Sequence, residues 1–248
     1  MKKMMMTALA ASLLASSAVA QRFSPYDYVG LEPDNGFSFM MLGGMTVSNF
    51  RMHDLVTNGL NPKVGFDLGV RAEYMLPQCG GVFINGGLEY KMKGARERIP
   101  AAIGDMIGLD ATWIARPMYF TVPVHVGYRY DILDDFGVYA DFGPYFAVGT
   151  NGKNRLKFDD FSSDVVHRFF RNDSDPNFYE VQRWDFGLGF RLGTEYARHY
   201  NFQLACDWGI TNMLTQGQQH ALVSIPELGL KNPALKNFNA SLVFAYRF

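Results

Sequence analysis

The chain of 248 residues is poor in charge, in cysteine and in long apolar runs, and each shortage excludes a class of protein. Only 19% of its residues are charged and the net charge is −1, which argues against a nucleic-acid partner. No apolar run of about eighteen residues follows Gln21, which argues against a bundle of membrane helices. The two cysteines are too few for a disulfide scaffold.

The two cysteines also fall in different kinds of segment. Cys79 lies in the turn-forming stretch 77–81, whereas Cys206 lies in the middle of an expected strand, on its apolar face. We therefore expect them to be far apart and unpaired.

What the chain has instead is a long series of segments in which apolar residues alternate with polar residues or glycine. In the last of them Leu242, Phe244 and Tyr246 share one face, opposite Ser241 and Arg247. A period of two predicts a β-strand. The chain ends on Phe248, and a terminal aromatic residue on such a strand resembles the signal that the bacterial outer-membrane assembly machinery recognises.

The N-terminus has the layout of a secretory signal peptide. Lys2 and Lys3 provide the positive charge, an apolar stretch follows, and 18–20 reads Ala-Val-Ala before Gln21. The predicted organisation is a cleaved signal peptide at 1–20, a periplasmic N-terminal lead at 21–36 and a transmembrane β-barrel at 37–248.

Eight strands are predicted, and short and long connections alternate strictly between them. The ranges of the strands are 37–47, 64–76, 81–93, 117–130, 135–148, 181–196, 200–212 and 236–248. The long connections are 48–63, 94–116, 149–180 and 213–235. This rhythm predicts an all-β fold, an eight-stranded antiparallel up-and-down transmembrane β-barrel of OmpX-like size. Both termini are then periplasmic and the long loops extracellular, in the bacterial outer membrane. A soluble β-sandwich also alternates its faces, but it does not require aromatic residues aligned at strand ends.

The two faces of the strands separate apolar side chains from charged ones. Tyr74, Tyr130, Tyr196 and Tyr246 fall near one end of four strands and are expected to form an aromatic girdle. The inward face carries charges of both signs, which predicts a salt-bridged plug rather than a general pore. Its members are Asp67, Arg71, Glu73, Glu89, Lys91, Lys93, Arg129, Asp141, Arg183, Asp185, Arg191, Glu195, Asp207 and Arg247.

Catalytic chemistry has little support in the sequence. Some barrels of this size act on lipid A, and such an enzyme needs a base near a serine nucleophile and an orienting acid. The trio that comes nearest is Ser48, His53 and Asp54 at the start of a long loop, and an ordinary loop histidine explains it as well. We expect no enzyme activity, no cofactor and no metal ion.

The longest loop contains two further features. Residues 173–177 open like a calcium loop, but Phe178 replaces the turn glycine and no acid fills the twelfth position. Phe158, Phe161, Phe169 and Phe170 lie among arginines and lysines. They form either an exposed docking surface or, as we expect, a cluster packed on the loop or the barrel rim.

Four segments together resemble the PorT-like outer-membrane β-barrel family of the Bacteroidetes. They are 119–128 (YFTVPVHVGY), 142–149 (FGPYFAVG), 185–196 (DFGLGFRLGTEY) and 207–213 (DWGITNM). Pro123 in the first should mark a bulge or a local opening, because it cannot donate to the strand ladder. The resemblance implies an accessory role in the envelope or in type IX protein secretion.

The leading hypothesis is therefore a non-enzymatic barrel that serves the envelope or protein secretion. The alternative is a surface barrel that binds ligands or host surfaces through its extracellular loops, and a lipid A-modifying enzyme is the third hypothesis. The expected partners are outer-membrane lipids and lipopolysaccharide, the outer-membrane assembly machinery, and envelope or secretion proteins.

Overall fold

The structure is a computed structural model that describes residues 36–55, 60–77, 79–98, 111–158, 164–170, 181–225 and 229–248. Within these ranges the chain forms ten strands and one helix. They are β1 (Phe37–His53), β2 (Asn61–Met75), β3 (Val82–Met92), β4 (Ala95–Arg98), β5 (Ala111–Leu133), β6 (Phe136–Phe158), β7 (Val165–Arg168), β8 (Trp184–Tyr196), β9 (Tyr200–Gly209), α3 (Gln216–Val223) and β10 (Ala234–Arg247).

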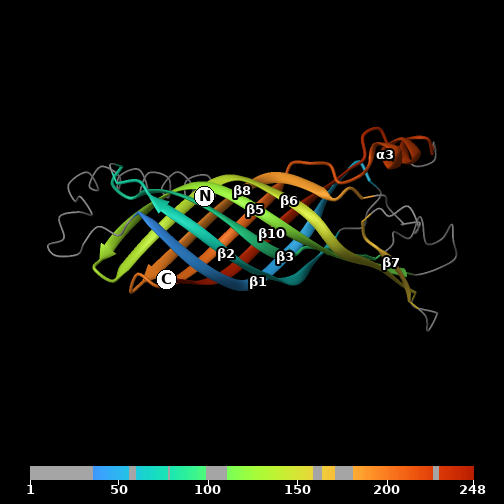
Figure 1. The fold of residues 1–248 in the computed structure, drawn as a ribbon. Helices are drawn as coiled ribbons and strands as arrows, with labels where there is room; N and C mark the ends of the chain where they lie inside the picture. Colours follow the sequence, from blue (N-terminus) through green and yellow to red (C-terminus); the bar gives the residue numbers. More distant parts are fainter. Residues whose placement is uncertain are drawn as a thin grey trace, which may run out of the picture.

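Eight of these strands close into an antiparallel ring. Each strand of the ring pairs with its neighbour in the chain, and β1 pairs with both β2 and β10, which closes the barrel. β4 continues the wall beyond β3 and pairs with β2 and β5, whereas β7 is added to the end of β6. Figure 1 shows the tight turns and the C-terminus at one end of the barrel, with α3 and β7 at the other. We call these the turn end and the loop end. The predicted eight-stranded barrel is confirmed.

The wall is apolar outside and polar inside. Met45, Leu204 and Leu242 are 62%, 60% and 59% exposed, whereas the inward Glu89 and Lys91 are each 1% exposed. A continuous apolar surface of this extent is not stable in water, and it matches the hydrocarbon layer of a membrane. In the described parts of the chain, no helix has the length and apolar character needed to cross a bilayer.

Two belts of aromatic side chains mark the borders of this apolar surface. At the turn end lie Tyr74, Tyr130, Tyr196 and Tyr246, the predicted girdle, and Tyr246 packs against Phe248 at 5.2 Å between ring centroids.

The second belt, which the sequence did not predict, lies toward the loop end. It includes the ring pairs Tyr90–Phe120 at 4.8 Å, Phe146–Trp184 at 5.2 Å and Trp208–Phe238 at 6.0 Å. Phe120 and Tyr130 are separated along β5 by a tilted strand segment that rises about 25 Å, the height of the apolar band of outer-membrane barrels.

Several strands extend beyond this second belt, and here the predicted boundaries were wrong. β1 reaches His53 rather than 47, β5 begins at Ala111 rather than 117, and β6 continues to Phe158 rather than 148. In these extensions the polarity inverts: Trp113 is buried inside the wall at 2% exposure, while Arg116 and Lys153 are exposed outside it. An apolar outer face is needed only where the wall meets lipid, so the pattern that predicted the strands ends before the strands do.

Two other strands are shorter than predicted, because the alternating pattern continues beyond the residues that pair in the wall. β8 begins at Trp184 and not at 181, and β9 ends at Gly209 and not at 212. Val181 is fully buried and forms isolated bridges to Phe170 and Leu214 instead. It belongs to the packing at the loop end rather than to the wall.

Pro123 marks a local opening and no bulge. Pairing between β5 and β6 stops after Pro123, opposite Tyr145, and resumes in the same register at Val126, opposite Phe142. The two register shifts in this pair of strands lie elsewhere, between Met118 and Tyr119 and between Asp131 and Leu133.

Several inward glycines make room for aromatic rings in the lumen. A Cβ added at Gly193 would meet the ring of Tyr139, and one at Gly187 would meet the ring of Tyr145. A Cβ at Gly127 would collide with the ring of Phe83, and would also lie 2.6 Å from the Cβ of Asp141 and 2.7 Å from the carbonyl oxygen of Ala140.

We predict that Gly127→Ala lowers the free energy of unfolding by about 1 to 3 kcal/mol, because strand backbone cannot move away from the added methyl group. Urea unfolding of the barrel in lipid vesicles measures this change. Gly86→Ala is the control, since a Cβ there would meet only the carbonyl oxygen of Pro123, at 3.6 Å. Equal stability of the two variants would contradict the prediction.

Candidate functional site

The lumen holds a series of ion-pair clusters, and the first lies at the turn end. Arg129 Nη2 is 2.5 Å from Glu73 Oε1, and its Nε is 3.3 Å from Glu195 Oε2. Arg247 Nη2 is 2.9 Å from an oxygen of each of the same two glutamates. Two cations and two anions from four strands thus neutralise one another, and Arg247 ties the last strand of the barrel to this cluster.

The middle of the lumen is organised around Glu89. Its carboxylate accepts hydrogen bonds from Arg71 Nη2 at 2.9 Å and Arg191 Nη2 at 3.0 Å, and Lys91 Nζ lies 2.8 Å away. Lys91 Nζ in turn is 2.9 Å from Asp207 Oδ2 and 3.3 Å from Asp67 Oδ2. Because these side chains are almost completely inaccessible to water, each charge depends on these partners for its solvation.

A histidine and an aspartate lie beside this cluster. His125 is 0% exposed, and its Nδ1 is 2.5 Å from Asp141 Oδ1. Asn85 also donates to Asp141, at 3.2 Å, and accepts from Arg191 at 3.3 Å. These contacts join the histidine to the Glu89 cluster.

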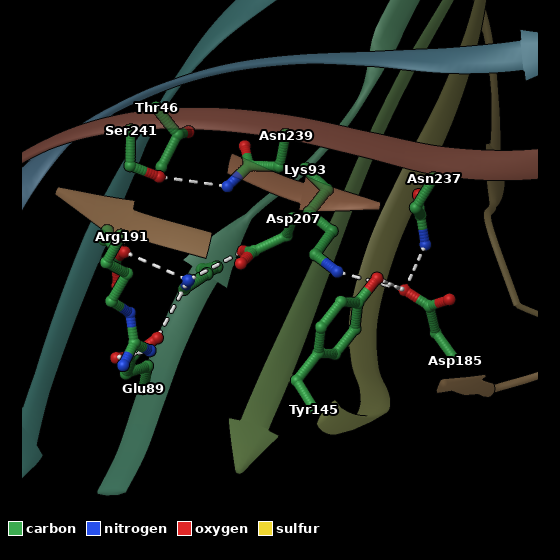
Figure 2. A network of polar contacts seen from close by, with 12 residues as sticks. Thr46, Glu89, Lys93, Tyr145, Asp185, Arg191, Asp207, Asn237, Asn239 and Ser241 are labelled. Atoms are coloured by element: carbon green, nitrogen blue, oxygen red, sulfur yellow. Dashed lines mark hydrogen bonds and ion pairs between the residues drawn. The ribbon is translucent and has the colours of Figure 1, made fainter. Parts of the chain in front are cut away.

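Toward the loop end the charges give way to a single ion pair between Lys93 and Asp185, and Figure 2 shows it beside the ring of Tyr145. Lys93 Nζ is 3.0 Å from Asp185 Oδ2, which also accepts hydrogen bonds from Tyr145 at 3.2 Å and Asn237 at 2.7 Å. The ammonium group lies 5.0 Å and 4.7 Å from the ring centroids of Tyr119 and Tyr145. Cation–π attraction therefore supports the ion pair at the border of an apolar region.

An apolar cap closes the lumen above Lys93. It consists of buried side chains from β1, β4, β5, β6, β10 and the connections at the loop end: Phe50, Ala95, Trp113, Ala115, Tyr119, Tyr145, Ala147, Phe169, Phe170, Val181, Met213, Leu214 and Leu235. Phe169 and Phe170 follow β7 and turn into the barrel, and Phe170 packs on the ring of Tyr119 at 5.4 Å. Of the aromatic cluster expected in the longest loop, these two residues pack inward. Phe161 lies outside the described residues.

Besides Lys93, eleven of the fourteen inward charged residues predicted from the sequence lie buried in the lumen. They are Asp67, Arg71, Glu73, Glu89, Lys91, Arg129, Asp141, Asp185, Arg191, Glu195 and Asp207. Arg247 lies with them at 12% side-chain exposure. Arg183 does not, and its prediction was wrong. It precedes β8, is exposed, and donates to the carbonyl oxygens of Gly149 and Thr150, both at 3.3 Å.

The trio weighed for catalysis is not assembled. Ser48 faces into the barrel, is 1% exposed and donates to the carbonyl oxygen of Gly94 at 3.1 Å. His53 is exposed, at the end of the same strand. No group of three or more His, Cys, Asp or Glu residues in the described ranges could hold a metal ion. The calcium-like segment 173–177 lies outside those ranges. Both cysteines are free, as predicted.

Asp54 has a different role, which the sequence did not reveal. Its carboxylate Oδ2 accepts the backbone N–H groups of Lys231 and Asn232 at 2.5 and 2.6 Å. These two hydrogen bonds, that of Asn232 first, lower the pKa of Asp54. The contact fastens the loop that follows β1 to the segment that precedes β10.

Other residues missed from the sequence could have been found from the phase of their strands. Tyr139 and Tyr145 have the same inward phase as Asp141 in β6, and Asn237 has that of Asn239 in β10. The apolar cap could not have been found in this way, because it combines strand extensions with residues such as Phe169 that lie outside the regular wall.

Comparison with known proteins gives one family. Residues 19–215 match the family described as outer membrane protein beta-barrel domain. No curated protein matches the chain.

The chain is also similar to several solved structures. OprG from Pseudomonas aeruginosa is 13% identical, with a TM-score of 0.46, over 86% of this chain and 96% of that one. A major outer membrane protein from Thermus thermophilus is 13% identical, with a TM-score of 0.41, over 86% and 100%. Ail, the attachment invasion locus protein of Yersinia pestis, is 13% identical, with a TM-score of 0.37, over 87% and 100%.

We predict that Glu89→Gln lowers the free energy of unfolding by about 3 to 5 kcal/mol, because it leaves three buried cations without their shared anion. Equilibrium unfolding in vesicles measures this. The control is Asp164→Asn, which breaks an exposed ion pair with Arg155 at 3.5 Å and should cost less than about 1 kcal/mol. Similar losses in both variants would show that the Glu89 cluster does not stabilise the barrel.

Proposed function

The chain belongs to the outer membrane protein beta-barrel domain family and is an integral outer-membrane protein, and we propose that it works as a closed barrel that binds ligands at its loop end. In this proposal the lumen is a structural plug without catalytic activity. The part of the molecule that meets partners is the strand extension and the loops beyond the second aromatic belt. The proposal corresponds to the surface-binding alternative considered from the sequence.

The proposal rests on the observation that two structures close the lumen, the ion pairs and the apolar cap. Ion pairs that span the barrel from the Arg247 cluster to Lys93 leave their charged groups almost inaccessible to water. Above them the apolar cap fills the same lumen with rings, among which Phe169 is 0% exposed. A solute that crossed this barrel would have to separate the buried ion pairs and displace the cap, at a cost of several kcal/mol for each charge left unpaired.

The loop end has the construction of a binding platform. β1, β5 and β6 carry the wall past the second belt, and their inner faces share the cap, so the extension has its own apolar core. Asp54 fastens two of the connections to each other. Binding residues on such a scaffold are held in place more precisely than on free loops.

The orientation in the membrane follows the usual arrangement of outer-membrane barrels. The connections at the turn end are short, for example Asp134–Asp135 between β5 and β6, and those at the loop end are long. We assign the loop end to the cell exterior and Phe248, at the turn end, to the periplasm, where the assembly machinery meets the last strand.

A second role rests on the resemblance to PorT-like proteins. The four segments that carry it fall on β5, β6, β8 and β9, which are consecutive in the ring. As an accessory of type IX secretion the chain would act through periplasmic turns such as 197–199. A deletion strain would then selectively lose secreted cargo proteins from its medium, whereas an unchanged set of secreted proteins would exclude this role.

We predict that the purified protein forms no steady ion-conducting pore in a planar lipid bilayer, because the ion pairs and the cap both obstruct the lumen. Phe169→Ala with Phe170→Ala removes part of the cap only and should stay closed, whereas the addition of Glu89→Gln and Asp185→Asn should allow brief conducting events. Steady conductance of the wild-type protein would contradict the closed barrel.

A further inference from the structure

A row of three cations crosses the outer face of the loop end. Arg116 on β5 is the direct strand partner of Lys153 on β6, and Lys153 is the direct partner of Arg168 on β7. All three side chains are exposed. Direct antiparallel partners have their Cβ atoms roughly 5 Å apart and on the same face of the sheet. Lys153 is therefore held between two arginines.

A single extra residue creates this row. Met118 pairs with Asn151 and the next residue, Tyr119, pairs with Gly149, so Thr150 is left over in β6. The extra residue reverses the phase of the strand. Below it the even-numbered Phe146 faces outward, and above it the odd-numbered Lys153 and Arg155 do.

A second row beside the first adds more positive charge. Arg96 on β4, Ile114 on β5 and Arg155 on β6 are successive partners. Lys63 on β2 lies close to both rows. Partial burial of its ammonium group, and then repulsion by Arg116, Arg96 and Arg155, lower the pKa of Lys63. We call Arg96, Arg116, Lys153, Arg155 and Arg168 the cationic wall.

Within the described residues the cationic wall has one ion pair, the exposed contact of Arg155 with Asp164 at 3.5 Å. Like charges in direct cross-strand positions destabilise a sheet. In the lumen nearly every charged side chain has a partner of opposite charge, whereas four of the five cations of the cationic wall have none among the described residues. A bound anion with several negative groups would remove this repulsion.

The height of the cationic wall above the second aromatic belt indicates which kind of anion it binds. Arg116 lies four residues beyond Phe120, which belongs to the second aromatic belt. On a tilted strand this places its Cα about 10 Å above the belt, within reach of the headgroup layer for a long arginine side chain. The row faces sideways, toward the surrounding lipid, because its members continue the outward face of β5, β6 and β7.

We propose that the cationic wall binds the phosphate groups of lipopolysaccharide in the outer leaflet, beside β5, β6 and β7. The site rests on the proposed function, since it requires that the loop end faces the cell exterior. Arginine matches phosphate oxygens with two parallel N–H donors, and Lys153 adds a compact charge between two such groups. The bound glycolipid anchors the strand extension at a fixed height in the membrane.

The test compares binding of purified lipopolysaccharide to the full-length barrel in detergent micelles with binding of the same lipopolysaccharide after its phosphates are removed. The variant Arg116→Gln/Lys153→Gln/Arg168→Gln should bind the phosphorylated form at least about tenfold more weakly. Cys79→Asp/Ala197→Asp/Arg198→Gln makes the same change in net charge in the turns at the opposite end of the barrel and should bind within about twofold of wild type.

Three outcomes would overturn the proposal. They are equal weakening in both triple variants, equal binding of the dephosphorylated form, and competition by inorganic phosphate or a soluble sulfated polysaccharide at concentrations similar to those of lipopolysaccharide. The last would assign the wall to a free anion or to a soluble glycan. Thermal unfolding of both triple variants without lipopolysaccharide shows that each barrel is folded.

The orientation is tested separately on intact cells with a membrane-impermeant maleimide. Gln216→Cys, exposed at the start of α3, should be labelled, whereas Cys79 in the turn between β2 and β3 should react only after the outer membrane is permeabilised. Labelling in the reverse order would overturn the proposed orientation and this site with it. The expected labelling together with equal lipopolysaccharide binding by all variants would overturn this site alone.

Discussion

Exclusion of charge from the lipid-facing surface is the constraint on which the rest of this structure depends. A strand that shows lipid an apolar side chain at every second position must place its polar residues inside, and in a ring of eight strands the inside is too narrow for water to solvate them. Each charge then needs a partner from another strand. Arg247 reaches Glu73 and Glu195, and Lys91 reaches Asp207 across the lumen. The ion pairs therefore fix which strands oppose one another, in addition to neutralising the interior.

The same constraint explains why the protein changes character along its axis. Between the two aromatic belts it is a membrane protein, with lipid outside and ion pairs inside. Beyond the second belt it is built like a water-soluble domain, with Trp113 and Phe169 in an apolar core and Arg116 and Lys153 outside. Lys93 lies at the change, where its ammonium group is held by Asp185 and by two tyrosine rings. One continuous set of strands thus serves two solvents.

This change of solvent also sets how much could be predicted from the sequence. The eight strands, their order and the inward phase of residues such as Glu89 and Arg191 follow from alternation, because lipid enforces the pattern without exception. The strand extensions do not, since Arg116 and Lys153 lie beyond the apolar layer of the membrane and carry no apolar signal. Arg183 was misplaced because its phase is right but β8 begins only after it, at Trp184. Contacts such as Asp54 with Lys231 join segments far apart in the sequence and have no local pattern at all.

The extra residue at Thr150 has a consequence for how this sequence can change over generations. Substitutions in β6 alter one side chain at a time, but the loss of one residue near 150 would restore a continuous phase and exchange the two faces of everything that follows in the strand. Lys153 and Arg155 would then point toward the place of the apolar cap, and Asn154, now inside at 2% exposure, would point outward. Length at this position should therefore vary far less among descendants of this gene than the identity of the residue itself.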